Sequence, residues 1–178
     1  PFKWRNFWDY GTGGLGDFGC HYIDLVHWAL DLRAPEKISA TGSLPDPVSC
    51  PSYVIADYHY PARGKQPPVH LTWYDGGKKP EILKTLTGKD GQPLDPRSGQ
   101  LFIGEQGMIL SDYSRHLLLP TDKFVDFTPP EQTIPQSIGH HQEWINAIKT
   151  GGTTTCNFDY SGALTEAVLL GTVAYRSG

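Results

Sequence analysis

The sequence has few cysteines and no long hydrophobic run. Its three cysteines, Cys20, Cys50 and Cys156, are far apart, and none forms a CxxC pair. Such a set gives neither a disulfide framework nor a zinc ribbon, and it favours a reducing compartment such as the cytoplasm. No apolar stretch approaches the roughly 20 residues that a membrane-spanning helix needs. The chain starts at Pro1 and not at a methionine, so we expect a fragment of a longer protein, and export stays open.

Positive charge is also sparse. The sequence contains 15 Lys and Arg against 19 Asp and Glu, which gives a formal net charge of −4, and its longest basic run is Lys78-Lys79. Because a nucleic-acid-binding surface needs a basic patch, nucleic acid is not an expected partner. A membrane is not expected either. At 178 residues the chain fits a single domain over 1–178 that can bury most of an ordinary core.

The order of the expected elements is one helix, then strands, then two helices. Apolar spacing predicts a first helix over 17–32 and two closing helices over 136–149 and 160–176. Strands are expected at 37–42, 53–60, 69–74, 82–87, 100–104, 108–112 and 116–119. Consecutive strands with short links pair antiparallel. We therefore predict an α+β fold with an open-faced, mainly antiparallel mixed β-sheet, helices packed on one face and no Rossmann domain.

The glycines Gly11, Gly13 and Gly16 have the GxGxxG spacing of a dinucleotide-binding loop. Such a loop follows a buried strand, whereas residues 3–10 are aromatic and polar. Asp17 comes directly after the third glycine, so its carboxylate would occupy the first helical turn, where the pyrophosphate has to bind. We therefore predict no cofactor-binding residue here and interpret the glycines as a tight turn that allows close approach to the helix start.

Ionisable side chains gather on one stripe of the first predicted helix. At about 100° per residue, Asp17, His21, Asp24 and Trp28 lie on the same side, and the rest of the helix is largely apolar. Buried charges are costly unless they pair or line a cleft. Asp17 and His21 are spaced i, i+4, so the carboxylate can orient the imidazole in a general acid/base unit. An Asp17 N-cap beside a hydrogen-bonded core histidine fits the spacing equally well.

The stretch from Trp4 to Leu32, above all GGLGDFGCHYID at 13–24, resembles the C-terminal domain of the glucose–fructose oxidoreductase, inositol dehydrogenase and MocA (Gfo/Idh/MocA) family. The family pattern is a glycine-rich segment, then Asp-x-Gly-x-His-x-x-Asp, then an aromatic residue. The matching positions are Asp17, Gly19, His21, Asp24 and Trp28. The chain from Gly139 to Ala167 is similar to the family as well.

The resemblance implies the substrate-binding and oligomerisation domain of an NAD(P)-dependent oxidoreductase that acts on the CH–OH group of a sugar, cyclitol or related polyol. His21 would then be the catalytic acid/base and Asp17 its catalytic partner. The family binds NAD or NADP mainly through an N-terminal nucleotide-binding domain. Since this chain lacks that domain, we expect it to hold no tightly bound cofactor and to be inactive alone. A homo-oligomer through the open sheet face is also implied.

Four further residues are candidates for substrate binding. Arg5 and Trp8 suit a polyol, because an aromatic face can meet C–H groups and a charged group can meet hydroxyls. Asp24 either binds substrate or holds His21, and His141 could line the pocket from the second predicted helix.

Two other functions compete with this hypothesis. The histidines and acids could be metal ligands, but no fourth well-spaced ligand accompanies them, so we predict no metal. The alternative to an enzyme is a non-catalytic binding or assembly module that uses the exposed sheet face.

Overall fold

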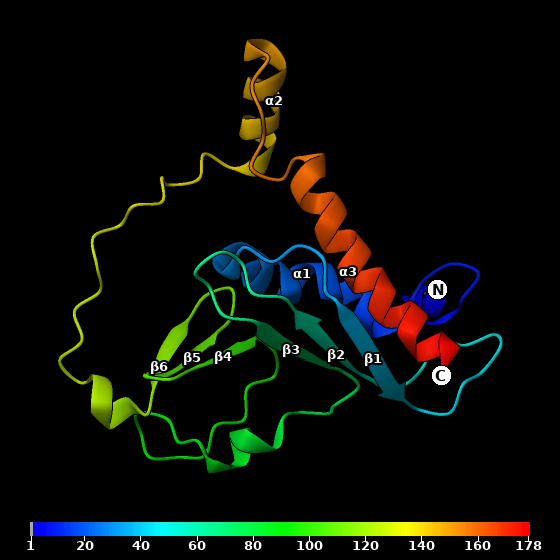
Figure 1. Cartoon of the computed structure of the whole chain (residues 1–178), viewed down its shortest axis with the longest axis horizontal. Coiled ribbons are helices and arrows are strands. Elements are labelled where there is room, and N and C mark those ends of the chain that lie inside the picture. Colours follow the sequence, from blue (N-terminus) through cyan, green and yellow to red (C-terminus); the bar gives the residue numbers. More distant parts are fainter. Residues whose placement is uncertain (1) are drawn as a thin grey trace.

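The computed structural model describes residues 2–178, which fold into helices and short strands (Figure 1). The α-helices are α1 (Gly13–Leu30), α2 (His140–Thr150) and α3 (Phe158–Ser177). The strands are β1 (Lys37–Gly42), β2 (Val54–Tyr60), β3 (Val69–Tyr74), β4 (Gln100–Gly104), β5 (Gly107–Ser111) and β6 (His116–Leu119). The 3-10 helices are η1 (Phe2–Asn6), η2 (Glu81–Thr85) and η3 (Thr121–Phe124). No helix among these is long and apolar enough to cross a membrane.

The strands form two antiparallel three-stranded sheets, in the orders β1-β2-β3 and β4-β5-β6. The predicted α+β class is confirmed. The single mixed sheet that we expected is replaced by two sheets, because the link over 75–99 contains η2 and loops and adds no strand between β3 and β4.

One predicted strand, at 82–87, is wrong. The segment forms η2 instead, and its two buried residues, Leu83 and Leu86, are spaced i, i+3. A 3-10 turn places residues i and i+3 on the same side, whereas a strand would place them on opposite faces. The short apolar run therefore packs with a period of three.

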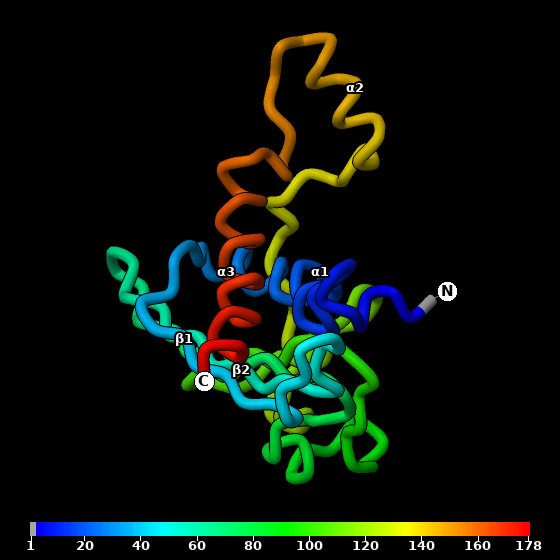
Figure 2. The backbone as a smooth tube through the Cα atoms, turned by 90° about the vertical axis from the view of Figure 1, so that its right-hand side faces the viewer, coloured from blue at the N-terminus to red at the C-terminus, as the bar shows by residue number. Residues whose placement is uncertain are grey.

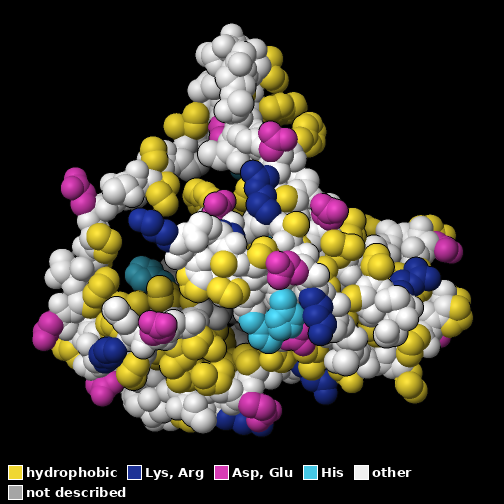
Figure 3. Space-filling model, viewed as in Figure 1, with side chains coloured by type: hydrophobic (Ala, Val, Ile, Leu, Met, Phe, Trp, Pro, Cys, Tyr) yellow, Lys and Arg dark blue, Asp and Glu magenta, His cyan; other side chains and the backbone are white. Residues whose placement is uncertain are grey.

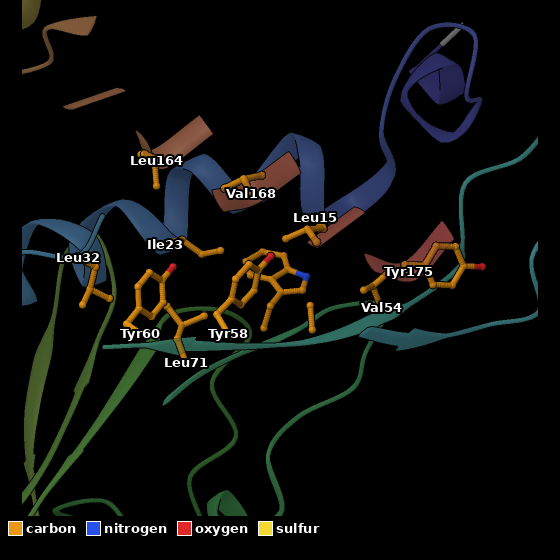
Figure 4. Close-up of a cluster of buried hydrophobic side chains, with 12 residues drawn as sticks. Leu15, Ile23, Leu32, Val54, Tyr58, Tyr60, Leu71, Leu164, Val168 and Tyr175 are labelled. Atoms are coloured by element: carbon orange, nitrogen blue, oxygen red, sulfur yellow. The ribbon is translucent and has the colours of Figure 1, made fainter. Parts of the chain in front are cut away.

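Helices α1 and α3 lie side by side on one face of the first sheet. The hydrophobic core fills the space between these helices and the sheet (Figure 4). Two glycines allow this close packing. An added Cβ on Gly19 would meet Val168 Cγ1 of α3 at 2.9 Å. An added Cβ on Gly171 would collide with Tyr58 Oη and would lie 2.7 Å from Leu15 Cδ2. The glycine of the Asp-x-Gly-x-His motif is thus a contact point between helices.

Helix α2 and its connections stand away from the two sheets (Figure 2). Its return segment is tied to it, because Glu143 accepts hydrogen bonds from the backbone N–H and the hydroxyl of Thr155. The apolar side chains of α2 remain exposed, namely Trp144, Ile145 and Ile148. Figure 3 shows hydrophobic side chains along this projecting part.

The outer face of the first sheet is polar. Asp57 Oδ1 lies 2.8 Å from His70 Nε2 and accepts a hydrogen bond from Thr72 Oγ1 at 2.7 Å. The ring of His59, on the neighbouring strand, stacks on that of His70 with centroids 4.5 Å apart. Figure 3 shows histidine side chains beside charged ones in the middle of the visible face. A homo-oligomer through this sheet face stays a prediction.

Candidate functional site

Helix α1 begins at Gly13, four residues earlier than the predicted 17, and this changes the place of Asp17. Asp17 lies in the second turn, so the hypothesis of an Asp17 N-cap is wrong, and so is its placement in the first turn. Thr12 is the N-cap residue and makes no side-chain cap.

The carboxylate beside the first turn of α1 belongs to Asp75, at the end of β3. An added Cβ on Gly14 would lie 2.6 Å from Asp75 Oδ2. Asp75 also accepts hydrogen bonds from the backbone N–H of Val54 and from Trp73 Nε1, the latter at 3.1 Å. Burial raises the pKa of the Asp75 carboxyl, and these two hydrogen bonds act in the opposite direction.

The glycine segment does not fit the phosphates of a dinucleotide. An added Cβ on Gly11 would lie 2.6 Å from the Arg5 backbone oxygen. An added Cβ on Gly13 would lie 3.0 Å from Cys50 Cβ. Protein atoms and the Asp75 carboxylate already occupy the space around the first turn. The glycines therefore allow close packing between the start of α1 and the segments around it.

Asp17 pairs with Arg5 of η1. Arg5 Nε lies 2.9 Å from each carboxylate oxygen of Asp17, and both side chains are partly exposed. The Arg5 guanidinium also lies over the Trp4 ring, 4.4 Å from its centroid. The i, i+4 contact that we hypothesised between Asp17 and His21 is absent from the hydrogen bonds recorded for residues 2–178. The cation that orients Asp17 is thus Arg5, twelve residues away in the sequence.

His21 lies on the exposed side of α1, and no hydrogen bond to its imidazole is recorded within the described chain. The core histidine of α1 is His27. It is 2 % exposed, and its Nε2 lies 2.8 Å from Tyr60 Oη. Burial lowers the pKa of His27 to about 4, although the charge of Asp24 opposes the shift. His27 is therefore neutral near pH 7, whereas the imidazole of His21 is open to solvent.

Asp24 is held by the last helix. Tyr160 of α3 donates its hydroxyl to Asp24 Oδ1 and lies 3.1 Å from the Asp24 backbone oxygen. Burial and then the Asp24 carboxylate raise the pKa of the Tyr160 hydroxyl, which keeps it a proton donor. Within residues 2–178, Asp24 makes no hydrogen bond to the imidazole of His21.

Trp8 and His141 lie apart from this group. The Trp8 indole donates to Asp46 backbone oxygen at 3.0 Å, Arg176 covers its ring at 4.7 Å, and its side chain packs against the core. His141 is exposed on α2, which stands away from α1 in two views (Figures 1 and 2). The structure thus brings Arg5, Asp17, His21 and Asp24 to one helix side, while Trp8 supports the entry segment.

No group of three His, Cys, Asp or Glu side chains in residues 2–178 is placed to hold a metal ion. The side chains on the exposed side of α1 can exchange a proton through an imidazole and accept hydrogen bonds through two oriented carboxylates.

Three residues of this region were missed by the sequence analysis. The Asp75 carboxylate lies beside the first turn of α1, Tyr160 donates a hydrogen bond to Asp24, and Tyr113 donates its hydroxyl to the His21 backbone oxygen at 3.3 Å. Tyr113 and Tyr160 are 92 and 136 positions from their partners in the sequence, so no local spacing reveals either contact. The Asp-Gly-Gly turn after β3 marks a chain reversal but does not show that Asp75 reaches α1.

Comparison with known proteins gives one match. Residues 2–66 match the family model described as "Oxidoreductase family, C-terminal alpha/beta domain", of the Gfo/Idh/MocA proteins. No curated protein matches the chain. The matched part includes η1, α1, β1 and β2, and it therefore contains every residue on the exposed side of α1. The segment that holds Arg5, Asp17, His21 and Asp24 is thus similar to the C-terminal domain of the Gfo/Idh/MocA oxidoreductase family.

Proposed function

We propose that this chain is the substrate domain of an NAD(P)-dependent oxidoreductase that acts on the CH–OH group of a sugar, cyclitol or related polyol. The observation that carries the proposal is the exposed side of α1. There an accessible imidazole, His21, lies on the same stripe as two carboxylates, and each carboxylate is oriented by a different element.

His21 is the residue that exchanges a proton with the substrate oxygen. As a neutral imidazole it accepts the hydroxyl proton when the alcohol is oxidised, and in the reverse direction it returns that proton. Asp17, with Arg5 bound to both its oxygens, accepts hydrogen bonds from substrate hydroxyls. Asp24 has the same capacity, limited by its bond to Tyr160.

A nicotinamide, when bound, supplies the hydride acceptor for such a reaction. The glycine segment of this chain does not fit its phosphates, so we assign that binding to another part of the oxidoreductase. The chain's own residues bind the polyol, orient it and handle its proton. Titration of this chain with NADH and NADPH, followed by nicotinamide fluorescence, should give no binding. Tight binding would contradict our interpretation of the glycines.

A non-catalytic assembly module is the second candidate, and exposed apolar side chains favour it. One face of α3 carries Phe158, Leu169, Leu170 and Val173, and α2 adds its own exposed apolar residues. An assembly role alone has no use for an accessible imidazole beside two oriented carboxylates. Both roles can reside in one domain, because they use different helices.

The test is His21→Ala in the oxidoreductase that contains this domain. Loss of a general acid/base typically lowers the rate by 10²- to 10⁴-fold, so we expect kcat for polyol oxidation to fall by about that factor. Binding of NADH, followed by its fluorescence, should be unchanged. His141→Ala is the matched control, since His141 is also exposed but lies on α2. An unchanged kcat in His21→Ala would refute the proposed role.

A further inference from the structure

The turn between β5 and β6 is held in a fixed shape by Asp112. Its Oδ1 accepts hydrogen bonds from the backbone N–H groups of Ser114 and Arg115, each at 2.8 Å. Its Oδ2 pairs with the Arg115 guanidinium at 3.0 Å. These bonds, with the one to Ser114 largest, lower the pKa of Asp112 to about 2. At neutral pH the turn therefore holds Tyr113, which lies between Asp112 and Ser114 in the sequence, in a defined direction.

That direction is toward the exposed side of α1. The Tyr113 hydroxyl donates to the His21 backbone oxygen at 3.3 Å, and its ring lies 5.6 Å from that of Tyr22 at 54°. A second bond joins the same sheet to the same helix turn, because Gln100 Nε2 donates to the Tyr22 backbone oxygen at 2.9 Å. The β4-β5-β6 sheet thus reaches α1 at His21 and Tyr22.

The aromatic rings at this place remain open to solvent. Tyr113 is 74 % exposed and Phe18 is 51 % exposed. Phe18 lies 6.5 Å from Tyr22 in a stacked orientation and 6.2 Å from the His21 ring. Desolvation, followed by the nearby Tyr22, Asp24 and Cys20, raises the pKa of Tyr113, which agrees with a hydroxyl laid against the helix. An exposed ring held by a rigid turn gains no core burial and is available to a ligand.

We propose that Tyr113 is a specificity-determining residue of this site, where its ring forms an aromatic wall beside His21 together with Phe18 and Tyr22. This inference rests on the proposed function and deepens it. The face of an aromatic ring is electrostatically negative. A cyclic polyol gathers several C–H groups on one face of its ring, and these carry partial positive charge. An open-chain polyol has no such fixed face, so the wall selects rings.

The alternative is that Tyr113 only fastens the second sheet to α1. Three variants separate the two roles. Tyr113→Phe keeps the ring and loses the hydroxyl, Tyr113→Leu keeps apolar bulk and loses the aromatic face, and Tyr113→Ala loses both. Phe127→Ala is the control on the same half of the chain, because the ring contact of Phe127 is to Phe124.

The experiment measures kcat and KM of the oxidoreductase that contains this domain, with myo-inositol as the cyclic probe and D-glucitol as the open-chain probe. We expect Tyr113→Ala and Tyr113→Leu to raise KM for the ring by roughly 10-fold, with smaller changes for the open chain and for kcat. Tyr113→Phe and Phe127→Ala should keep the wild-type ratio of the two KM values.

Each result has a distinct meaning. Equal changes for both probes, or an unchanged ratio in Tyr113→Leu, would overturn the role of Tyr113 in specificity. If that occurs while His21→Ala still abolishes turnover, the proposed function stands and only the aromatic wall fails. If the wild-type protein oxidises neither probe, the polyol function fails and the wall with it. Urea unfolding of Tyr113→Phe checks that the hydroxyl contact is not needed for folding.

Discussion

The two sides of α1 each carry a histidine, and the two histidines have opposite environments. On the buried side, His27 is enclosed by the core and bound to Tyr60, and burial keeps it uncharged near pH 7. On the exposed side, His21 keeps an open imidazole, while Asp17 and Asp24 are bound by Arg5 and Tyr160.

This difference shows how one helix can both build a core and present a reactive surface. On the buried side, packing determines which residues fit. A polar side chain there, His27, makes a hydrogen bond inside the core and cannot reach a substrate. The exposed side is specified by partners from η1, α3 and the β5–β6 turn, which orient groups without enclosing them.

A large loss of stability should come from changing the packing of α3 on the buried side. Gly171→Ala places a Cβ against Tyr58 Oη and Leu15, and overpacking of this kind costs about 1–3 kcal/mol or more. Gly162→Ala is the matched control in the same helix, since nothing lies within 4 Å of its added Cβ. It should stabilise the protein by about 0.5–1 kcal/mol. Urea unfolding measures both, and equal behaviour would contradict the close contact.

The buried histidine should make the protein sensitive to acid. The pKa of His27 is about 4 in the folded state against 6.5 for a histidine side chain in water, so the unfolded chain binds a proton that the folded chain excludes. This stability is fully present above pH 6.5 and is lost as the pH falls toward 4. At about 1.4 kcal/mol per pKa unit, the loss reaches roughly 3 kcal/mol.

Urea unfolding at pH 7 and pH 4.5 measures this loss. The side chain in His27→Gln cannot titrate, so the difference in unfolding free energy between the two pH values should shrink in that variant. A wild-type pH dependence that His27→Gln leaves intact would show that other groups cause it.

The smallest effect on stability should come from the exposed side. Arg5→Ala removes a pair whose side chains are 43 % and 34 % exposed, so solvent screening limits its contribution to under about 1 kcal/mol. The variant should lose turnover clearly while its free energy of unfolding changes little, because Asp17 loses the group that orients it. Asp17→Asn should give a similar pattern, and a loss of stability as large as that of Gly171→Ala would contradict this division of roles.

Much of the fold follows from the sequence, and its failures have physical causes. The limits of β1, β3, β4 and β6 agree with the predicted ranges, since period-two patterns between turn residues are local signals. The strand predicted at 82–87, which forms η2 instead, and the predicted start of α1 do not agree. Both depend on packing between distant segments, such as Asp75 against Gly14.

The candidate site divides in the same way. The stripe of α1 was predictable, because helix geometry alone places His21, Asp17 and Asp24 on one side. The partner of each group was not predictable, because Arg5, Tyr160 and Tyr113 come from other elements. The i, i+4 spacing of Asp17 and His21 permits a contact between their side chains, but the Asp17 carboxylate binds the Arg5 guanidinium instead.

The most direct test of the account compares His21→Gln and His27→Gln side by side in the oxidoreductase that contains the domain. Single-turnover hydride transfer at pH 7.5, followed by nicotinamide absorbance, measures the reaction, and urea unfolding measures stability. We predict that His21→Gln loses the rate and keeps the stability, whereas His27→Gln keeps most of the rate and loses stability. A His21→Gln variant as fast as the wild type, or a folded His27→Gln variant without turnover, would contradict the account.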